Sequence, residues 1–176
     1  YIIDKIFKGR NMIKVPTSIY LRTLDGKEFD FSAFARTHNC VVFIYPKIGE
    51  DFELLSEQLQ KTAGMKGCTK QAINYKKLLK EFNDLGFMVV AIGSQDIAAQ
   101  KKFEEETATG VMFLNDSEFM LERALELPVF AASNGHKFYF RQTLIIKGGN
   151  IRRAYIVDEP ENDAKNMLEK IKNEDY

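Results

Sequence analysis

Residues 67–92 read GCTKQAINYKKLLKEFNDLGFMVVAI. Cys68 follows a glycine and is followed by a long run of helix-forming residues, which Asp84-Leu85-Gly86 brings to an end. Residues 87–92 then form an apolar run with the length and composition of a strand. This stretch therefore predicts a helix with a cysteine at its start, followed directly by a buried strand.

The position of Cys68 indicates what the sulfur can do. The first amides of a helix are unpaired and carry partial positive charge, so they favour a thiolate over a thiol. Lys66 and Lys70 add positive charge on both sides. Cysteine is also among the most buried residue types, so Cys68 is either a reactive nucleophile or a small apolar filler, and the lysines favour the nucleophile.

The segment before this helix has two parts. Residues 40–45 are a short apolar run without alternation, as expected for a central strand covered on both faces, and Pro46 ends it. Residues 47–66 read as an insertion in which Phe52, Leu55 and Leu59 recur at helical spacing. We expect a short amphipathic helix there, which either simply covers the fold or serves as a lid or partner surface.

The remaining elements follow from periodicity. Residues 18–24 and 27–31 alternate around Asp25-Gly26, which predicts an N-terminal hairpin, and Ser32 is expected to cap a short helix. Three elements should follow the strand at 87–92: a helix from Ser94 or Asp96 through Phe103, a strand at 112–114 and a helix at 116–125.

The last third predicts an antiparallel pair and a terminal helix. Residues 138–146 and 151–157 are strand-like and are joined through Gly148-Gly149-Asn150, a hairpin turn. Ala164, Met167, Leu168 and Ile171 then mark one face of an amphipathic helix.

Composition limits the classes of function. The chain has 176 residues, of which 45% are hydrophobic, and no apolar run is long enough to cross a bilayer. Lys plus Arg and Asp plus Glu each total 25, so no basic stripe indicates nucleic-acid binding. We therefore expect one globular domain spanning 1–176, without nucleic-acid or membrane partners.

Cysteine and histidine usage gives no sign of a cofactor. Cys40 and Cys68 are too far apart for a CxxC motif or half of a zinc site. His38 and His136 fall in expected loops without a carboxylate at ligand spacing and read as surface residues. We expect no metal and no cofactor, and by default a cytoplasmic protein.

The order of elements predicts an α/β protein with a thioredoxin-like fold, in which helices flank a central mixed sheet behind an N-terminal hairpin. Four segments also resemble the peroxiredoxins, most closely the bacterioferritin comigratory protein type, or peroxiredoxin Q, within the alkyl hydroperoxide reductase and thiol-specific antioxidant superfamily. The segments are Tyr45-Pro46-Lys47, Gly67-Cys68-Thr69-Lys70-Gln71-Ala72, Val90-Ala91-Ile92-Gly93-Ser94-Gln95-Asp96 and Arg141-Gln142-Thr143-Leu144-Ile145-Ile146.

The resemblance implies a thiol peroxidase. Cys68 would reduce hydrogen peroxide and organic hydroperoxides through a sulfenic acid, with Pro46 shielding the thiolate and Arg141 holding its charge. Backbone amides near Gly67 would act as further donors. Without the resemblance, Arg141 reads as a strand residue in a surface ion pair and Pro46 as the end of a strand.

The sequence departs from the family pattern in three places. The interval from Pro46 to Cys68 is longer than usual, and Met65 stands where the family has Thr or Ser. Thr62 and Thr69 are the candidates for supplying the missing hydroxyl. Ile73 stands where many relatives carry a resolving cysteine, five positions after the first.

The third departure implies a one-cysteine cycle. The sulfenic acid would be reduced by an external thiol, either thioredoxin-like or of low molecular weight, and Cys40 is the alternative resolving thiol, although it reads as core packing. A thioredoxin-fold redox-sensing or interaction module with a degenerate site is the competing interpretation, suggested by Met65 and Ile73. The resemblance allows a monomer or a homodimer.

Overall fold

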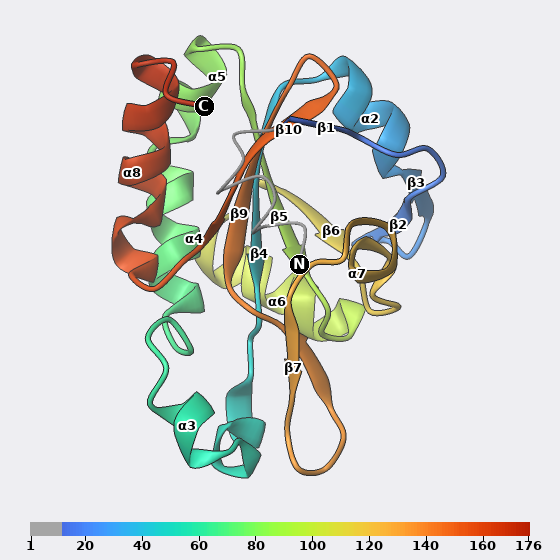
Figure 1. The fold of residues 1–176 in the computed structure, drawn as a ribbon, viewed down its shortest axis with the longest axis vertical. Helices are drawn as coiled ribbons and strands as arrows, with labels where there is room; N and C mark the ends of the chain where they lie inside the picture. The colour runs from blue at the N-terminus through green and yellow to red at the C-terminus, as the bar shows by residue number, and fades with distance from the viewer. Residues whose placement is uncertain (1–11) are drawn as a thin grey trace.

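The computed structural model describes residues 12–176, so residues 1–11 of the expected single domain lie outside the described part. An eight-stranded mixed sheet runs in the order β1-β10-β9-β4-β5-β6-β2-β3 (Figure 1). Its strands are β1 (Ile13–Lys14), β2 (Tyr20–Thr23), β3 (Glu28–Asp30), β4 (Cys40–Tyr45), β5 (Met88–Gly93), β6 (Met112–Asn115), β9 (Gln142–Lys147) and β10 (Asn150–Ile156). Strands β4, β5 and β6 are parallel, and β9 runs antiparallel to β4.

Strand β4 lies inside the sheet, and all of its residues are buried. Its side chains alternate between two cores: Cys40 and Ile44 belong to one cluster, while Phe43 and Tyr45 belong to the other. The unbroken apolar run is thus explained by burial on both faces.

Helices cover both faces of the sheet, which confirms the predicted α/β architecture (Figure 1). The helices are α2 (Phe31–Thr37), α4 (Cys68–Lys77), α5 (Leu79–Asp84), α6 (Ile97–Thr107), α7 (Met120–Leu125) and α8 (Pro160–Lys172). Residues of α2 and α7 share the core of Cys40, whereas residues of α4, α6 and α8 share the core of Tyr45. Among residues 12–176, no helix is long and apolar enough to cross a membrane.

Three predicted helix boundaries are corrected. Asp30, not Ser32, caps α2, because its carboxylate accepts from Ala33 N while the Ser32 hydroxyl accepts from Ile19 N. The helix predicted to start at residue 116 begins only at Met120, since the Asp116 carboxylate accepts from the amides of Met120 and Leu121. The long helix after Cys68 is interrupted at Leu78.

The strand predicted at 138–146 is two strands. Residues Lys137–Tyr139 form β8, which pairs with β7 (Val129–Ala131) in a separate two-stranded sheet, and the main sheet resumes at Gln142. Phe140 N donates to Pro128 O at the break, so the chain leaves one sheet before it joins the other. Arg141 therefore lies in the junction, not within a strand as the sequence suggested.

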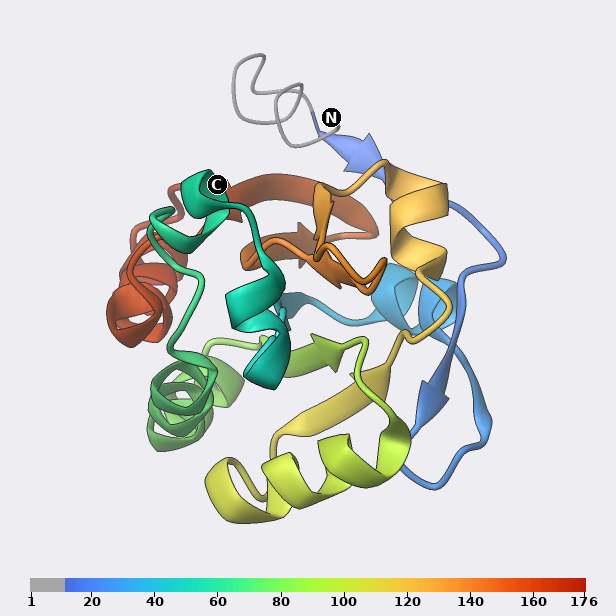
Figure 2. The same cartoon turned by 90° about the horizontal axis from the view of Figure 1, so that it is seen from below.

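Residues 47–66 do not form the single helix expected from their spacing. They contain a 3₁₀ helix, η1 (Gly49–Leu54), and one turn of α-helix, α3 (Glu57–Gln60), because Ser56 caps a new helix through Leu59 N. Leu55 and Met65 from this segment pack against Phe130 and Phe138 of the β7–β8 ribbon. Figures 1 and 2 show both extending beyond the same end of the main sheet. Residues of the 47–66 segment line the pocket described next.

Candidate active site

Cys68 is the first residue of α4 and is 8% exposed. Gly67 caps the helix with φ 116°, and no side chain bonds the first amides. A Cβ on Gly67 would lie 2.9 Å from Pro160 Cγ, so both its backbone angle and its neighbour require glycine. The sulfur is thus held at the positive end of α4, beside the start of α8.

Arg141 carries a permanent positive charge to this sulfur. Its Nη2 donates to Cys68 Sγ at 3.2 Å, its Nη1 to Gln71 Oε1 at 2.7 Å and its Nε to Gly64 O at 2.9 Å. The side chain is 1% exposed. All three nitrogens of the buried fork are engaged, which fixes the cation against Sγ.

The loop before Cys68 is held by the same arginine. Gly64 accepts the Arg141 Nε hydrogen bond through its carbonyl and has φ 85°. A Cβ on Gly64 would collide with the carbonyl oxygen of Val157, at the end of β10. Gly64 therefore ties residues 64–67 to both the arginine and the sheet.

A pocket of about 540 Å³ opens over Cys68. One wall is apolar and comes mainly from the 47–66 segment, and the rim carries lysines and one carboxylate. The lining residues are Lys47, Ile48, Gly49, Phe52, Met65, Lys66, Gly67, Cys68, Thr69, Lys70 and Glu161. Lys66 Nζ lies 4.1 Å from the centre of the Phe52 ring, so the rim combines positive charge with apolar surface.

Some of the other residues predicted from the sequence line this pocket and others do not. Pro46 is buried directly after β4, and the pocket lining does not include it. Thr69 lines the pocket next to Cys68. Thr62 is exposed, lies outside the lining and donates its hydroxyl proton to Gln58 O, so the structure does not bring it to the sulfur. Met65, three positions before Cys68, does line the pocket.

Cys40 and Cys68 are not brought together. Cys40 belongs to the core on the opposite face of the sheet from the Cys68 cluster, at the end of β4 remote from Tyr45. Its Sγ–H donates to His38 O at 3.1 Å, and burial raises the pKa of the Cys40 thiol to about 12. A protonated, buried thiol is a poor nucleophile.

The histidines lie outside the site. His136 Nδ1 is 2.6 Å from Asp51 Oδ2 on the surface, and His38 stacks on Phe34. Within residues 12–176, no group of three or more His, Cys, Asp or Glu side chains is placed to hold a metal ion.

Sequence reasoning missed two buried residues behind the arginine. Gln71 Oε1 accepts from Arg141, and Gln71 Nε2 donates to Asp163 Oδ2 at 3.0 Å. Gln71 could have been found from its spacing, because a residue three positions after Cys68 shares its helix face. Asp163 could have been suspected as an acid four residues before Met167, within the apolar stripe of α8.

The sequence profile of the Redoxin family matches residues 12–171. The chain belongs to the redoxin family. Among proteins of known type it is similar to the peroxiredoxin Q enzymes. The chloroplastic peroxiredoxin Q of Suaeda salsa is 25% identical over 157 residues, which are 88% of this chain and 62% of that protein. The chain thus spans less than two thirds of this curated relative.

Solved redoxin structures share the fold. Peroxidoxin BcpB of Mycobacterium tuberculosis is 20% identical with a TM-score of 0.69, and the match covers 93% of this chain and 98% of that one. The bacterioferritin comigratory protein of Xanthomonas campestris is 16% identical with a TM-score of 0.70, covering 93% and 96%. That protein, solved as a trapped intermediate/ligand complex, has alkyl peroxide reduction activity.

Proposed function

We propose that this redoxin is a thiol-dependent peroxidase that reduces hydrogen peroxide and organic hydroperoxides at Cys68. The observation that carries the proposal is the contact of Arg141 Nη2 with Cys68 Sγ, at the start of α4 and beneath an open pocket.

The chemistry is a two-electron displacement. The Cys68 thiolate attacks the terminal oxygen of the hydroperoxide, the S–O bond forms as the O–O bond breaks, and the alkoxide or hydroxide leaves and takes a proton from water. Negative charge moves from sulfur to the leaving oxygen, so the donors must act along that path. Arg141 and the first amides of α4 lie at its beginning, and Thr69 on the pocket wall is the hydroxyl nearest to Cys68 in sequence.

Organic hydroperoxides suit this pocket better than hydrogen peroxide. Ile48, Phe52 and Met65 offer apolar contact to an alkyl group, whereas hydrogen peroxide needs hydrogen bonds that these side chains cannot make. The activity of the Xanthomonas campestris relative on alkyl peroxides supports the same substrate class for this chain.

Turnover then requires a thiol from outside the chain. Cys40 lies on the other face of the sheet, and Ile73 stands on α4 where a resolving cysteine would be. An external thiol would attack the Cys68 sulfenic acid, forming a mixed disulfide and water, and a second thiol would release Cys68. A thioredoxin-like protein or a low-molecular-weight thiol can supply both equivalents.

We also propose a single domain in which residues 47–66 are an insertion, acting as a monomer or homodimer. Two unpaired cysteines fit a reducing compartment such as the cytoplasm. Pro46, which directly follows β4, would shield the thiolate.

The test is the rate of sulfenic-acid formation after mixing reduced protein with stoichiometric hydroperoxide. We expect a rate orders of magnitude above that of free cysteine thiolate. Cys68→Ser should abolish the reaction, and Arg141→Ala should slow it by roughly ten- to a thousandfold. Cys40→Ser is the matched control and should react like the parent.

A parent rate comparable to free cysteine would refute the peroxidase. It would favour the second candidate, a redox-sensing or interaction module, for which the apolar Met65 beside the thiol is the supporting observation.

A further inference from the structure

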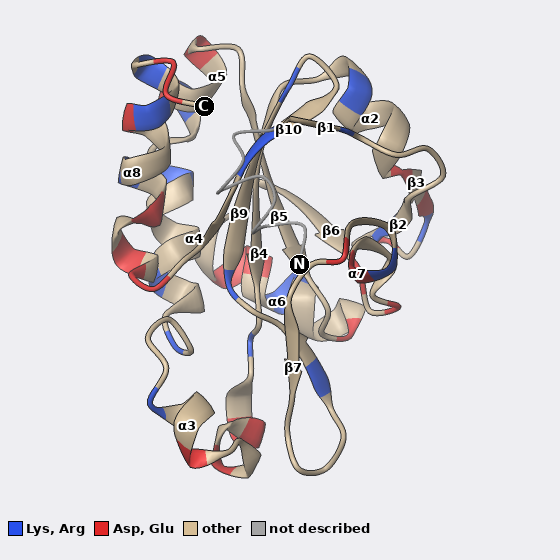
Figure 3. Cartoon of the chain, viewed as in Figure 1, with Lys and Arg blue, Asp and Glu red and all other residues tan. Residues whose placement is uncertain are grey.

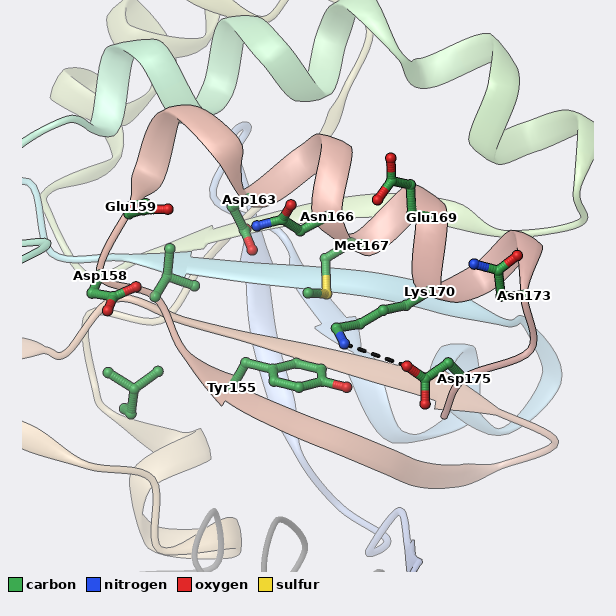
Figure 4. A pocket seen from close by; sticks show the side chains of 12 residues that line it. Tyr155, Asp158, Glu159, Asp163, Asn166, Met167, Glu169, Lys170, Asn173 and Asp175 are labelled. Atoms are coloured by element: carbon green, nitrogen blue, oxygen red, sulfur yellow. Dashed lines mark ion pairs between the residues drawn. The ribbon is translucent and has the colours of Figure 1, made fainter.

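Asp163 is a buried carboxylate in the first turn of α8, with 3% of its surface exposed. Figure 4 shows its side chain directed from α8 toward the strands. Its Oδ2 accepts three hydrogen bonds, from Tyr75 OH at 2.7 Å, Thr143 Oγ1 at 2.8 Å and Gln71 Nε2 at 3.0 Å. One oxygen of α8 thus joins two residues of α4 and one of β9.

The two ends of the Gln71 amide are assigned by their neighbours. Arg141 has only donors, so the amide atom that faces Nη1 must be the oxygen, and the atom that faces the Asp163 carboxylate must be the nitrogen. If the carboxylate were removed, the nitrogen end of the amide would lose this hydrogen bond, and only the bond to Arg141 would restrain it. Asp163 therefore anchors Gln71 from the side opposite Arg141.

Both negative and positive groups surround the hydrogen bonds that link Asp163, Gln71, Arg141 and Cys68. Asp163 and the Cys68 thiolate are both anions near one guanidinium, and Glu161 is a further acid on the pocket rim, opposite Lys47, Lys66 and Lys70. Burial raises the pKa of Asp163, against the effect of its three donors and of Arg141. Tyr75 and Tyr45 are the buried phenols of this core, and burial raises the pKa of each. The remaining titratable groups of α4, α8 and β9 are lysines and glutamates.

We propose that Asp163 is a positioning residue for Cys68: by fixing the amide of Gln71 it holds Arg141 in the orientation that donates to Sγ. Because this role concerns the thiol of the proposed peroxidase, it rests on the proposed function. The C-terminal helix is thereby part of the site, although Asp163 does not touch the substrate.

Two roles for this carboxylate predict opposite results. If Asp163 acts only through its charge, its removal leaves Arg141 to the thiolate alone, and Cys68 becomes reactive at lower pH. If it positions the arginine, its removal loosens the cation, and Cys68 becomes reactive only at higher pH. A purely structural role would lower stability and leave the pH profile unchanged.

The experiment follows the pH dependence of Cys68 alkylation by iodoacetamide in full-length protein carrying Cys40→Ser. Asp163→Leu, which is similar in size but accepts no hydrogen bond, should raise the midpoint by about one pH unit. Asp163→Asn keeps an acceptor oxygen and loses the charge, so its midpoint should stay at or below that of the parent. Thr143→Val is the matched control, because it removes one donor to Asp163 without touching Gln71, and should leave the midpoint in place.

Gln71→Leu breaks the same chain one step nearer the arginine and should raise the midpoint to the same extent. Combined with Asp163→Leu it should give no further rise, since both act through one path. A lowered or unchanged midpoint in either Leu variant overturns the proposal, and if Asp163→Leu does not fold, Gln71→Leu with Asp163→Asn decides it. Alkylation needs no peroxide, so loss of the proposed activity would be recognised separately, as a parent that alkylates normally but reacts slowly with hydroperoxide.

Discussion

Met65 is the residue that sets this site apart from the family pattern. It stands three positions before Cys68, where related peroxiredoxins carry a hydroxyl, and it lines the pocket while packing with the cluster of Leu55 and Phe130. A thioether accepts hydrogen bonds only weakly, so it offers little to a bound peroxide. At this position the pocket of Cys68 therefore offers a substrate apolar contact instead of a hydrogen bond.

Met65→Thr should shift selectivity toward hydrogen peroxide. A new hydroxyl near the thiolate that adds a hydrogen bond of about 1 kcal/mol corresponds to a rise of about fivefold in rate. The measurement is the ratio of second-order rate constants for hydrogen peroxide and a bulky alkyl hydroperoxide. Met65→Val controls for the lost volume and should leave that ratio near the parent value. An equal ratio in both variants would contradict the role given to the hydroxyl.

The elements that form the pocket come from distant parts of the chain. Segment η1 supplies Phe52, the start of α4 supplies Cys68, and Glu161 comes from the start of α8. Figure 3 shows acidic residues gathered on η1 and lysines closer to the start of α4. Within this arrangement η1 supplies an apolar wall, and its acidic residues do not line the pocket.

Phe52→Ala should lower kcat/KM for bulky alkyl hydroperoxides by about tenfold, because apolar contact with the substrate is lost. The rate with hydrogen peroxide should change little. Leu54→Ala is the control on the same segment, since Leu54 is 41% exposed and does not line the pocket. Equal losses with both substrates would mean that Phe52 supports the loop rather than the substrate.

For the whole molecule, the buried acids give a pH dependence of stability that differs in sign from that of a surface acid. Burial raises the pKa of Asp163, so its contribution to stability is present below its ordinary value of 3.8 and is lost as pH rises through the folded value. The hydrogen bond with His136 lowers the pKa of Asp51, so that contribution is present above 3.8 and is lost as pH falls.

Urea unfolding between acidic and neutral pH tests this difference. The stability of the parent minus that of Asp163→Asn should decrease as pH rises, because the variant has no charge to bury. The same difference for Asp51→Asn should increase. Parallel slopes for the two variants would show that burial does not control the ionisation of Asp163.

The local hydrophobic pattern of the sequence predicted most strands and helices. The features that it missed depend on pairing between strands that are distant in sequence. The run at 40–45 could be assigned because burial on both faces leaves a continuous apolar signature. The break at Phe140 and Arg141 could not, because it depends on pairing with β7 and with β4, which no local pattern encodes. Within the site, Cys68 was predicted from its place at the start of a helix and Arg141 through resemblance, whereas Asp163 meets its partners only 20 to 92 positions away in sequence.

The small exposure of Cys68 affects which thiols can reduce its sulfenic acid. A reductant must reach the oxidised sulfur in line with the S–O bond, and only 8% of this residue is open to solvent. A slender thiol can enter through the pocket as it stands. For a cysteine on the surface of a folded protein, we expect the approach to become easier when the first turn of α4 unwinds, away from Pro160. We therefore expect low-molecular-weight thiols to reduce oxidised Cys68 faster than protein thiols as long as this helix is intact.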